Sequence, residues 1–513
     1  MNRVRLAALA VLLLLAGAVP GAAAATPPVA SAKERIWPDE SIYFIMVDRF
    51  HNGDPANDGR VNPADPKAWH GGDLQGVIDK LDYIKQLGFT AIWLTPIVKN
   101  DGNDYHGYGA IDFFETDPHF GTVAKAKELV DKAHAKGLKV IWDVVVNHTG
   151  PTSPLVREHP DWFHPKARIT DWNDSRQIQE GWIYDLPDFD QSKPEVREYI
   201  LKYSRFWIEQ TGADGFRLDT VKHVPPEFFA WYAQELQKIK PGFWLIGESW
   251  DQMPERPALY QQQGIAAMID FPTSETARDV FGKGGSMSNL ANATADVGQV
   301  MPNPWQMGGF LDNHDMARFV SFAPNDQVRR LKLGLTWLFT QRSIPIMYYG
   351  TEIAMAGGND PDNRHDFPWG KEENPEVGAL VRQLNQIRHD HMALRRGTVV
   401  ELAAKWGYYA FGRAAGDDRV IVVLNNEETG PLSTPIDVTP MALADGTRLT
   451  DALSGKEVVV AGGQIQPEVG PRSGAIYVVP GRKVSPAVLW GGLLLAGAGA
   501  SAAVVLWTRK RRR

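Results

Sequence analysis

Carboxyl side chains recur at the ends of short apolar runs along this chain. Asp219 ends one run, Glu248 ends the next, and Asp315 ends a third. Two carboxyl groups on either side of a bond suit glycoside cleavage, because together they stabilise an oxocarbenium-like transition state. Capping would explain one or two residues of this kind, whereas a whole series favours a catalytic site. The other polar residues at these run ends are Asp143, Asn147, His148, Asp312, Asn313 and His314.

Arg217 lies two residues before Asp219, so both side chains should share one face of a strand. Its guanidinium group is expected to keep the Asp219 carboxyl ionised, as a nucleophile requires. Glu248 stands between Trp244 and Trp250 in the sequence, and an apolar setting would raise its pKa towards that of a working acid. Neighbouring parallel strands lie about 5 Å apart, which fits the short carboxyl separation of retaining glycosidases.

The elements that must position these residues are eight short apolar runs separated by helical segments. Helices such as Leu74–Leu87 and Val123–Lys136 have apolar residues three and four positions apart, and they stop at Gly88 and Gly137. This alternation predicts an α/β fold, the (β/α)8 TIM barrel, whose active sites lie at the carboxyl ends of the strands. The predicted strands are Ile42–Val47, Ala91–Ile97, Lys139–Val145, Gly215–Asp219, Trp244–Glu248, Ala266–Phe271, Gly308–Asp315 and Ile344–Gly350.

Two segments interrupt or follow the barrel, which is assigned to residues 36–146 and 191–394. A stretch rich in Trp, Pro, Asp and His after the third strand predicts an inserted subdomain over 147–190. Beyond Leu394, short alternating runs separated by Gly, Asp and Asn predict a C-terminal antiparallel β-sandwich over 395–480.

The charge and composition of the chain exclude several classes of function. The formal net charge is -7, without a basic stripe in the body of the chain, so no nucleic-acid partner is expected and a neutral substrate fits better. The chain contains no cysteine, which excludes disulfides, thiolate zinc sites and thiol catalysis. Nothing in the sequence indicates the oligomeric state, and a monomer is assumed.

Both ends of the chain predict export. A basic start, an apolar run and small residues over 1–25 are typical of a cleavable signal peptide. Residues 486–507 are uncharged and are predicted to form a transmembrane anchor, followed by a basic cytoplasmic tail at 508–513. The enzyme is therefore expected at the extracellular face of the membrane. The alternative is a removable sorting signal, which would leave a secreted protein.

Four segments together resemble the conserved segments of the α-amylase family of glycoside hydrolases. They are DVVVNH (Asp143–His148), GFRLDTVKH (Gly215–His223), GES (Gly247–Ser249) and LDNHD (Leu311–Asp315). The resemblance covers residues 36–480 and is greatest to bacterial secreted α-amylases, with local similarity to cyclodextrin glucanotransferases. It implies the same barrel, the insertion after the third strand and the C-terminal β-domain.

The resemblance also implies roles for individual residues. Asp219 would be the nucleophile, Glu248 the general acid/base, and Asp315 a third carboxylate that binds sugar hydroxyls and strains the ring. Residues that would contact the glucan are Tyr108, His148, Arg217, Lys222, His223, His314, Asp360, Arg364 and Tyr184.

Two calcium sites are implied by the same resemblance. The first would use Asn147, Asp188, the carbonyl of His223 and a carbonyl near Gln179, between barrel and insertion. The second would use Asn52, Asp54, Asn57, Asp58, Gly71 and Asp73. Such oxygen-rich sets suit Ca²⁺. The alternatives are polar groups that bond to each other at the first position, and a solvated turn at the second.

The expected activity is retaining endo-hydrolysis of α-1,4 bonds in starch-type glucans and maltooligosaccharides, as in an α-amylase. A cyclodextrin or maltooligosaccharide hydrolase and a glucanotransferase are the alternatives, because they share the glycosyl-enzyme intermediate. A non-catalytic glucan-binding or transporter-accessory protein is a more distant alternative, since such a protein would be expected to lack one of the three carboxylates.

Overall fold

Eight parallel strands form the centre of the molecule. The computed structural model describes residues 35–102 and 104–480. The eight-stranded sheet has the order β8-β7-β6-β5-β2-β1-β10-β9, and a parallel bridge between Ile269 and Gly308 joins its two edges. The predicted TIM barrel is confirmed. Its strands are β1 (Ile42–Ile45), β2 (Ala91–Leu94), β5 (Lys139–Val144), β6 (Gly215–Leu218), β7 (Trp244–Gly247), β8 (Ala267–Met268), β9 (Gly308–Gly309) and β10 (Ile344–Tyr348).

The strands end earlier than predicted. The prediction continued each strand through its terminal polar residues, whereas β6 ends at Leu218 and β7 at Gly247. Asp219 and Glu248 therefore stand just beyond the hydrogen-bonded ladder, where the backbone can turn their side chains into the mouth of the barrel. The early strand ends therefore place these carboxyls beyond the sheet, at the mouth of the barrel, although both side chains are buried.

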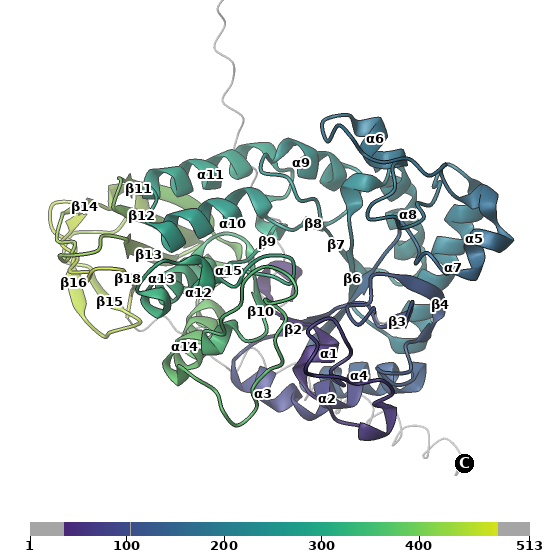
Figure 1. Cartoon of the computed structure of the whole chain (residues 1–513). Coiled ribbons are helices and arrows are strands. Elements are labelled where there is room, and N and C mark those ends of the chain that lie inside the picture. Colours follow the sequence, from purple (N-terminus) through teal and green to yellow (C-terminus); the bar gives the residue numbers. More distant parts are fainter. Residues whose placement is uncertain (1–34, 103, 481–513) are drawn as a thin grey trace, which may run out of the picture.

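Helices surround the barrel (Figure 1). The predicted helix Leu74–Leu87 is divided in two at Lys80, whereas the predicted helix Val123–Lys136 is continuous. Gly88 and Gly137 follow these helices with φ angles of 91° and 73°, a conformation that glycine adopts without strain. The longer helices are α2 (Leu74–Asp79), α3 (Leu81–Gln86), α4 (Val123–Ala135), α7 (Pro194–Thr211), α8 (Pro226–Ile239), α9 (Glu255–Gln262), α10 (Phe271–Ala277), α11 (Met287–Val300), α13 (Gln327–Thr340) and α14 (Pro375–Asp390).

Two irregular segments extend the barrel near the ends of its strands. A hairpin of β3 (Val98–Asn100) and β4 (Ala110–Thr116) follows β2. Between β5 and α7, the chain forms the short helices α5 (Pro154–Glu158) and α6 (Ser175–Glu180). An antiparallel bridge between His148 and Asp188 ties the two ends of this insertion together.

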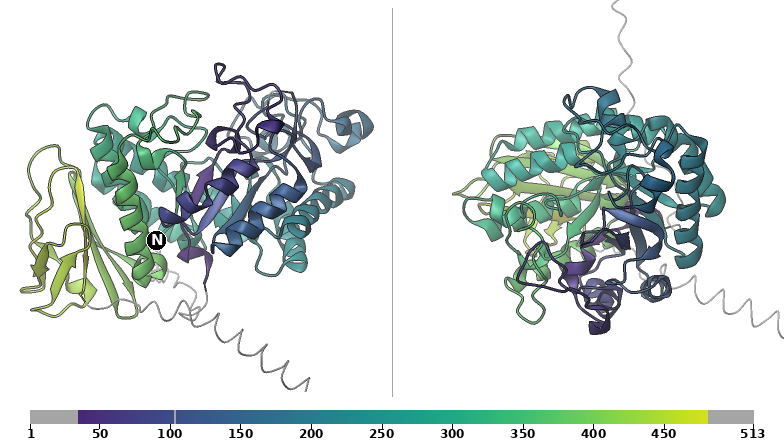
Figure 2. Two further views of the ribbon diagram at one scale, coloured as in Figure 1. Left: turned by 90° about the horizontal axis from the view of Figure 1, so that it is seen from below. Right: turned by 45° about the vertical axis from the view of Figure 1, so that its right-hand side comes forward.

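The C-terminal part is antiparallel, as predicted, and its sheet lies beside the barrel helices (Figure 2). Arg413 of β12 is fully buried and donates to the carbonyl of Thr340, the last residue of barrel helix α13, at 2.7 Å. The six-stranded sheet contains β11 (Thr398–Ala404), β12 (Tyr408–Ala415), β13 (Asp418–Asn425), β18 (Ser473–Val478), β15 (Arg448–Asp451) and β16 (Glu457–Val459), and β14 (Ile436–Asp437) pairs with β17 (Gln464–Ile465).

The expected membrane location is corrected. Within residues 35–102 and 104–480, no helix is both long and apolar enough to cross a bilayer. The predicted anchor at 486–507, the basic tail at 508–513 and the signal peptide at 1–25 lie outside the described residues. A membrane-anchored enzyme therefore has no support in the structure, and it forms no part of the function proposed below.

Candidate active site

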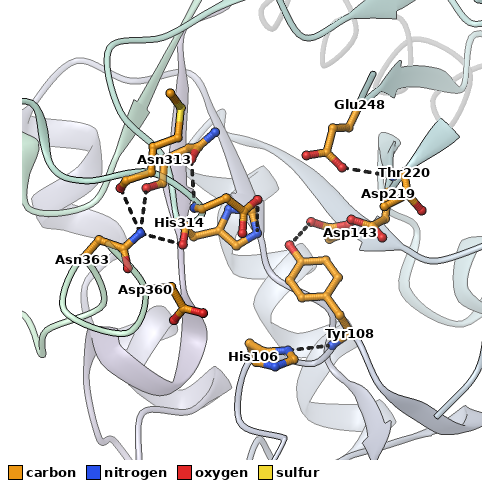
Figure 3. Close-up of polar contacts among 12 residues, drawn as sticks. His106, Tyr108, Asp143, Asp219, Thr220, Glu248, Asn313, His314, Asp360 and Asn363 are labelled. Carbon is orange, nitrogen blue, oxygen red and sulfur yellow. Dashed lines mark hydrogen bonds and ion pairs between the residues drawn. The ribbon is translucent and has the colours of Figure 1, made fainter. Parts of the chain in front are cut away.

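Arg217 joins three carboxyl groups at the mouth of the barrel. Its Nη1 lies 2.7 Å from Asp219 Oδ1 and 2.9 Å from Asp143 Oδ1, and its Nη2 lies 2.9 Å from Glu248 Oε2. All four side chains are buried. Because both nitrogens belong to one guanidinium group, Asp219 and Glu248 are held a few ångström apart, with their carboxyls towards the same space (Figure 3).

Strand register explains why Asp219 and Glu248 reach the same depth. Strand β6 pairs in parallel with β7, and Leu218 is opposite Gly247. The amide of Glu248 donates to the carbonyl of Leu218 at 2.9 Å, so the pairing continues one step past the assigned strands. Adjacent parallel strands are about 5 Å apart, which places the two carboxyls at the spacing used by retaining glycosidases.

Burial separates the proton affinities of the two carboxyls. It raises the pKa of Glu248 to about 7, to which the charges of Asp219 and Asp315 contribute while Arg217 opposes the rise. Burial also raises the pKa of Asp219 to about 6, again against the effect of Arg217. Arg217 therefore limits the rise at Asp219 and does not bring its pKa below the ordinary value. At neutral pH Asp219 is mostly ionised, whereas much of Glu248 keeps its proton.

The backbone just after Asp219 is strained. Thr220 has a φ of 46°, in the left-handed region that is unfavourable for a β-branched residue. In this conformation its amide donates to Glu248 Oε2 at 3.0 Å. Strain of this kind gathers at functional sites, where surrounding contacts impose it. Here it turns a backbone donor towards the carboxyl of Glu248.

Asp143 has more polar partners than its position at a strand end indicated. Besides Arg217, it accepts hydrogen bonds from the indole of Trp93 at 3.0 Å and from the hydroxyl of Tyr108 at 2.8 Å. The Trp93 ring stacks on Phe44, with centroids 3.7 Å apart. Sequence reasoning missed Trp93, because an apolar strand residue gives no sign of a polar partner.

Asp315 lies in the loop that follows β9. Its carboxyl lies 3.4 Å from His314 Nε2 and 3.3 Å from Arg364 Nη2. Arg364 also pairs with Asp360 at 3.1 Å, so two residues that were expected to contact the glucan lie together beside Asp315. Burial, together with Arg364 and Arg217, lowers the pKa of His314 well below the usual value, and its ring is therefore neutral.

The remaining expected contact residues are more scattered. His148 donates from Nε2 to the carbonyl of Tyr108 at 3.1 Å, and burial lowers its pKa to about 4. Lys222 donates to the carbonyl of Trp250 at 2.8 Å, and the ring of its neighbour His223 contacts Ile178. Tyr184, also expected to contact the glucan, is 93% exposed.

Trp244 lies elsewhere than expected. It is the first residue of β7 and stacks on Trp37, with ring centroids 4.0 Å apart, at the end of the strand away from Glu248. Trp250, the other tryptophan expected beside Glu248, stacks on Phe271 at 5.2 Å. The prediction that Trp244 lies beside Glu248 is wrong, because the two residues are at opposite ends of strand β7.

The first expected cation position contains oxygens without partners. Asn147 Oδ1 and Asp188 Oδ1 are buried and accept no hydrogen bond from the described residues. Burial raises the pKa of Asp188 to about 7, although its other oxygen, Oδ2, pairs with His164 Nδ1 at 2.6 Å. The carbonyl of Ile178, one residue before the expected Gln179, lies 2.8 Å from His223 Nδ1. An oxygen-binding cation would fit these residues better than mutual hydrogen bonds do.

The second expected calcium position also contains buried oxygens without hydrogen-bond partners. Asn52 Oδ1 and Asn57 Oδ1 are buried without a hydrogen-bond partner among the described residues. Gly71 has a φ of 92°, and a Cβ there would come within 2.7 Å of Asp58 Oδ1. Asp73 accepts from the amides of Gly53 and Asp54, which curls the loop around the cluster. A side chain at position 71 would therefore collide with the Asn52 and Asp58 side chains, which are hydrogen-bonded to each other.

Comparison with known proteins decides the family. The model of the α-amylase catalytic domain matches residues 44–398, a range that begins within β1 and contains the other barrel strands and every carboxyl described above. The chain belongs to the α-amylase family. It is therefore a glycoside hydrolase, and the resemblance drawn from the four segments is confirmed.

Its relatives within the α-amylase family carry different names. A β/α-amylase of Paenibacillus polymyxa is 37% identical over 86% of this chain, although the chain spans only 38% of that protein. A cyclomaltodextrinase of Geobacillus thermopakistaniensis is 32% identical over 87% of this chain and 77% of its own length. The crystal structure of an Anoxybacillus α-amylase has 43% identity and a TM-score of 0.84, covering 87% of this chain and 99% of that one.

Proposed function

We propose that this chain is a retaining hydrolase of α-1,4-glucosidic bonds that acts on cyclodextrins and maltooligosaccharides. Asp219 is the nucleophile, Glu248 the general acid/base and Asp315 the carboxylate that binds sugar hydroxyls near the cleavage point. The observation that carries the proposal is the pair of ion contacts from one guanidinium, Arg217, to Asp219 at 2.7 Å and to Glu248 at 2.9 Å. Such closely held carboxyls favour retention.

The reaction has two steps. In the first, the Asp219 carboxylate attacks the anomeric carbon while Glu248 gives its proton to the glycosidic oxygen, so that the bond breaks and a glycosyl ester forms. In the second, Glu248 takes a proton from water, whose oxygen attacks the anomeric carbon and releases Asp219. The first step needs Glu248 protonated and Asp219 ionised. The raised pKa of Glu248 and the guanidinium beside Asp219 suit these two protonation states.

The choice of substrate rests on the relatives. Three relatives that align over most of both chains are named cyclomaltodextrinases, and another is named a neopullulanase. These names support the small-substrate activity over the endo-acting α-amylase expected from the sequence. Endo-hydrolysis of starch is the second candidate, supported by the similarity to the Anoxybacillus α-amylase. Transfer to a sugar acceptor would use the same intermediate.

A size-resolved time course of products from β-cyclodextrin and from soluble starch tests the substrate. We expect β-cyclodextrin to be opened and shortened to small linear products at a kcat/KM at least as high as that for starch. Faster starch cleavage, with long oligosaccharides early in the reaction, would favour the endo-α-amylase. New cyclic products from starch would indicate a glucanotransferase.

The activity should depend on pH through both carboxyls. The dependence of kcat/KM should be bell-shaped, falling below pH about 6 as Asp219 gains a proton and above about 7 as Glu248 loses one. Since the groups interact, the two limbs belong to the pair. In Glu248→Gln, assayed with an aryl glycoside whose leaving group needs no proton, the alkaline limb should disappear. An unchanged alkaline limb would exclude Glu248 as the acid.

We further propose that calcium binds at both oxygen-rich positions. Asn147, Asp188 and the carbonyl of His223, with a carbonyl at Ile178 or Gln179, would hold one ion between barrel and insertion. The loop of Asn52, Asp54, Asn57, Asp58, Gly71 and Asp73 would hold another. The unpartnered buried oxygens of Asn147, Asp188, Asn52 and Asn57 support this assignment. The ions would compensate charge and join loops, outside the catalytic steps.

Calcium removal should therefore lower the thermal midpoint. Saturating binding stabilises a folded protein by about 3–4 kcal/mol per site, so exhaustive chelation should cost roughly 5 °C or more. Gly71→Ala should reduce the calorimetric stoichiometry from two ions to one. Gly88→Ala is its matched control, because Gly88 has nearly the same φ, 91°, and an equally close Cβ contact away from either site. An unchanged midpoint after chelation would refute both sites.

A further inference from the structure

Asn363 lies beneath the segment that carries Asp315. Its side chain is fully buried, and its Nδ2 lies 2.7 Å from the carbonyl of His314 and 2.9 Å from that of Met316. The two N–H groups of one amide thus bond the residues on either side of Asp315 (Figure 3). A third, longer contact of 3.5 Å reaches the carbonyl of Asn313.

The backbone of Asn363 is itself held in place. Its backbone carbonyl accepts from Arg318 Nε at 2.9 Å, and the backbone amide of Arg318 donates to the carbonyl of Gly357. The next residue, Arg364, donates from Nε to the same His314 carbonyl at 2.9 Å. The loop after β10 and the loop after β9 are therefore joined rigidly at the base of Asp315.

The Asp315 carboxyl has no comparably firm support of its own. Its contacts with His314 and Arg364, at 3.4 and 3.3 Å, are longer than ordinary charge-assisted hydrogen bonds, and the side chain is 30% exposed. Its backbone amide is bound by Asn313 Oδ1 at 2.9 Å. The direction of the carboxyl is therefore set mainly by the backbone of residues 313–316.

We propose that Asn363 is a positioning residue that fixes the backbone on both sides of Asp315 and so aims its carboxyl at the sugar. The inference rests on the proposed role of Asp315. Asn363 touches no substrate in this scheme and acts only through the loop. Loss of the two donors would let the carbonyls of His314 and Met316 turn, and the carboxyl would move with them.

A displaced Asp315 should affect the transition state more than the bound substrate. Misplacement of a catalytic group by about 1 Å can cost on the order of 10²-fold in rate. We therefore expect Asn363→Asp and Asn363→Ala to lower kcat on a maltooligosaccharide by about 10- to 100-fold, with KM changed less than about threefold. Asn363→Asp keeps the shape of the side chain and removes the paired donors. It therefore provides a second test of the same loss if the alanine variant does not fold.

Asn426→Ala is the matched control. Asn426 is also a buried asparagine whose Nδ2 donates to backbone carbonyls, those of Val280 at 2.8 Å and Gly285 at 3.5 Å, and whose Oδ1 has no partner among the described residues. It lies at the end of β13, outside the active site. Its replacement should lower the thermal midpoint without lowering kcat. If the Asn363 variants reduce kcat no more than Asn426→Ala does at a similar midpoint, the positioning role is wrong.

A double-mutant cycle with Asp315→Asn completes the test. If Asn363 acts through Asp315, then Asn363→Asp should cost at least about fivefold less in kcat on the Asp315→Asn background than on the wild-type enzyme. Fully additive effects would overturn the inference. An Asp315→Asn enzyme with undiminished activity would instead refute the proposed role of Asp315, so the two failures are distinguishable.

Discussion

Replacing Asp219 by Asn is expected to lower kcat on maltooligosaccharides by about 10⁴-fold or more, because the amide cannot form the glycosyl ester. The fold should persist, since the side chain keeps its shape and Arg217 keeps its contacts with Asp143 and Glu248. Initial rates with purified protein measure the effect. Asp437→Asn, at an exposed position in the C-terminal sheet, is the control and should retain full activity.

A small anion separates the roles of the two carboxyls. In Asp219→Gly, azide can enter the space of the nucleophile and attack the anomeric carbon directly, which should give a β-glycosyl azide. In Glu248→Ala, azide should attack the glycosyl ester on Asp219 and give an α-glycosyl azide. Proton NMR of the products distinguishes the two. The same anomer from both variants, or undiminished hydrolysis by either, would refute the assignment.

Replacing Arg217 by Leu should destabilise the protein by about 3–5 kcal/mol, because it leaves buried carboxyls without their cation. Without Arg217, the pKa values of Asp143, Asp219 and Glu248 should rise further above their unfolded values. Acids whose pKa is raised by folding contribute stability when protonated, and that contribution is lost as pH rises towards the folded pKa. The cost measured by denaturant unfolding should therefore be larger at pH 8 than at pH 5.

Arg388→Leu provides the comparison for this pH dependence. Arg388 is equally buried, but its hydrogen bonds go to the backbone carbonyls of Phe339, Leu394, Pro38 and Ser343. Its loss should also destabilise the fold, with little change between the two pH values. A cost at Arg217 that is independent of pH would contradict the electrostatic role assigned to it. Arg217→Lys should recover only part of the stability, because a single ammonium cannot bond all three carboxyls in the geometry of the guanidinium.

The barrel and the carboxyl residues could be predicted because local sequence determines them. An apolar run that ends in a polar residue predicts both a buried strand and its exposed end, as with Gly215–Asp219. The break between α2 and α3 at Lys80 was missed, because neither glycine nor proline marks it. Trp244 was misplaced for a related reason: sequence distance does not tell which end of a strand faces the site.

The residues that support the catalytic groups were harder to predict. Asn363 follows Asp315 by almost fifty positions, and Trp93 precedes Asp143 by fifty. Nothing local in the sequence shows that they meet, because the packing of neighbouring barrel loops and strands brings them together. Family resemblance indicates Asp360 and Arg364, whereas nothing in the sequence indicates a role for the buried Asn363 between them. The catalytic residues can therefore be predicted from local sequence patterns, whereas the residues that position them are recognised only in the folded structure.

The central claim is that glucan cleavage passes through a covalent bond to Asp219. Peptide mapping by mass spectrometry, after Glu248→Gln has reacted with a maltosyl fluoride, tests it most directly. The fluoride leaves without a proton, so the ester should form, and without the base it should be hydrolysed slowly. We expect one maltosyl group on the peptide that contains Asp219. A maltosyl group on any other residue, or cleavage to a β-anomeric product without an adduct, would contradict the account.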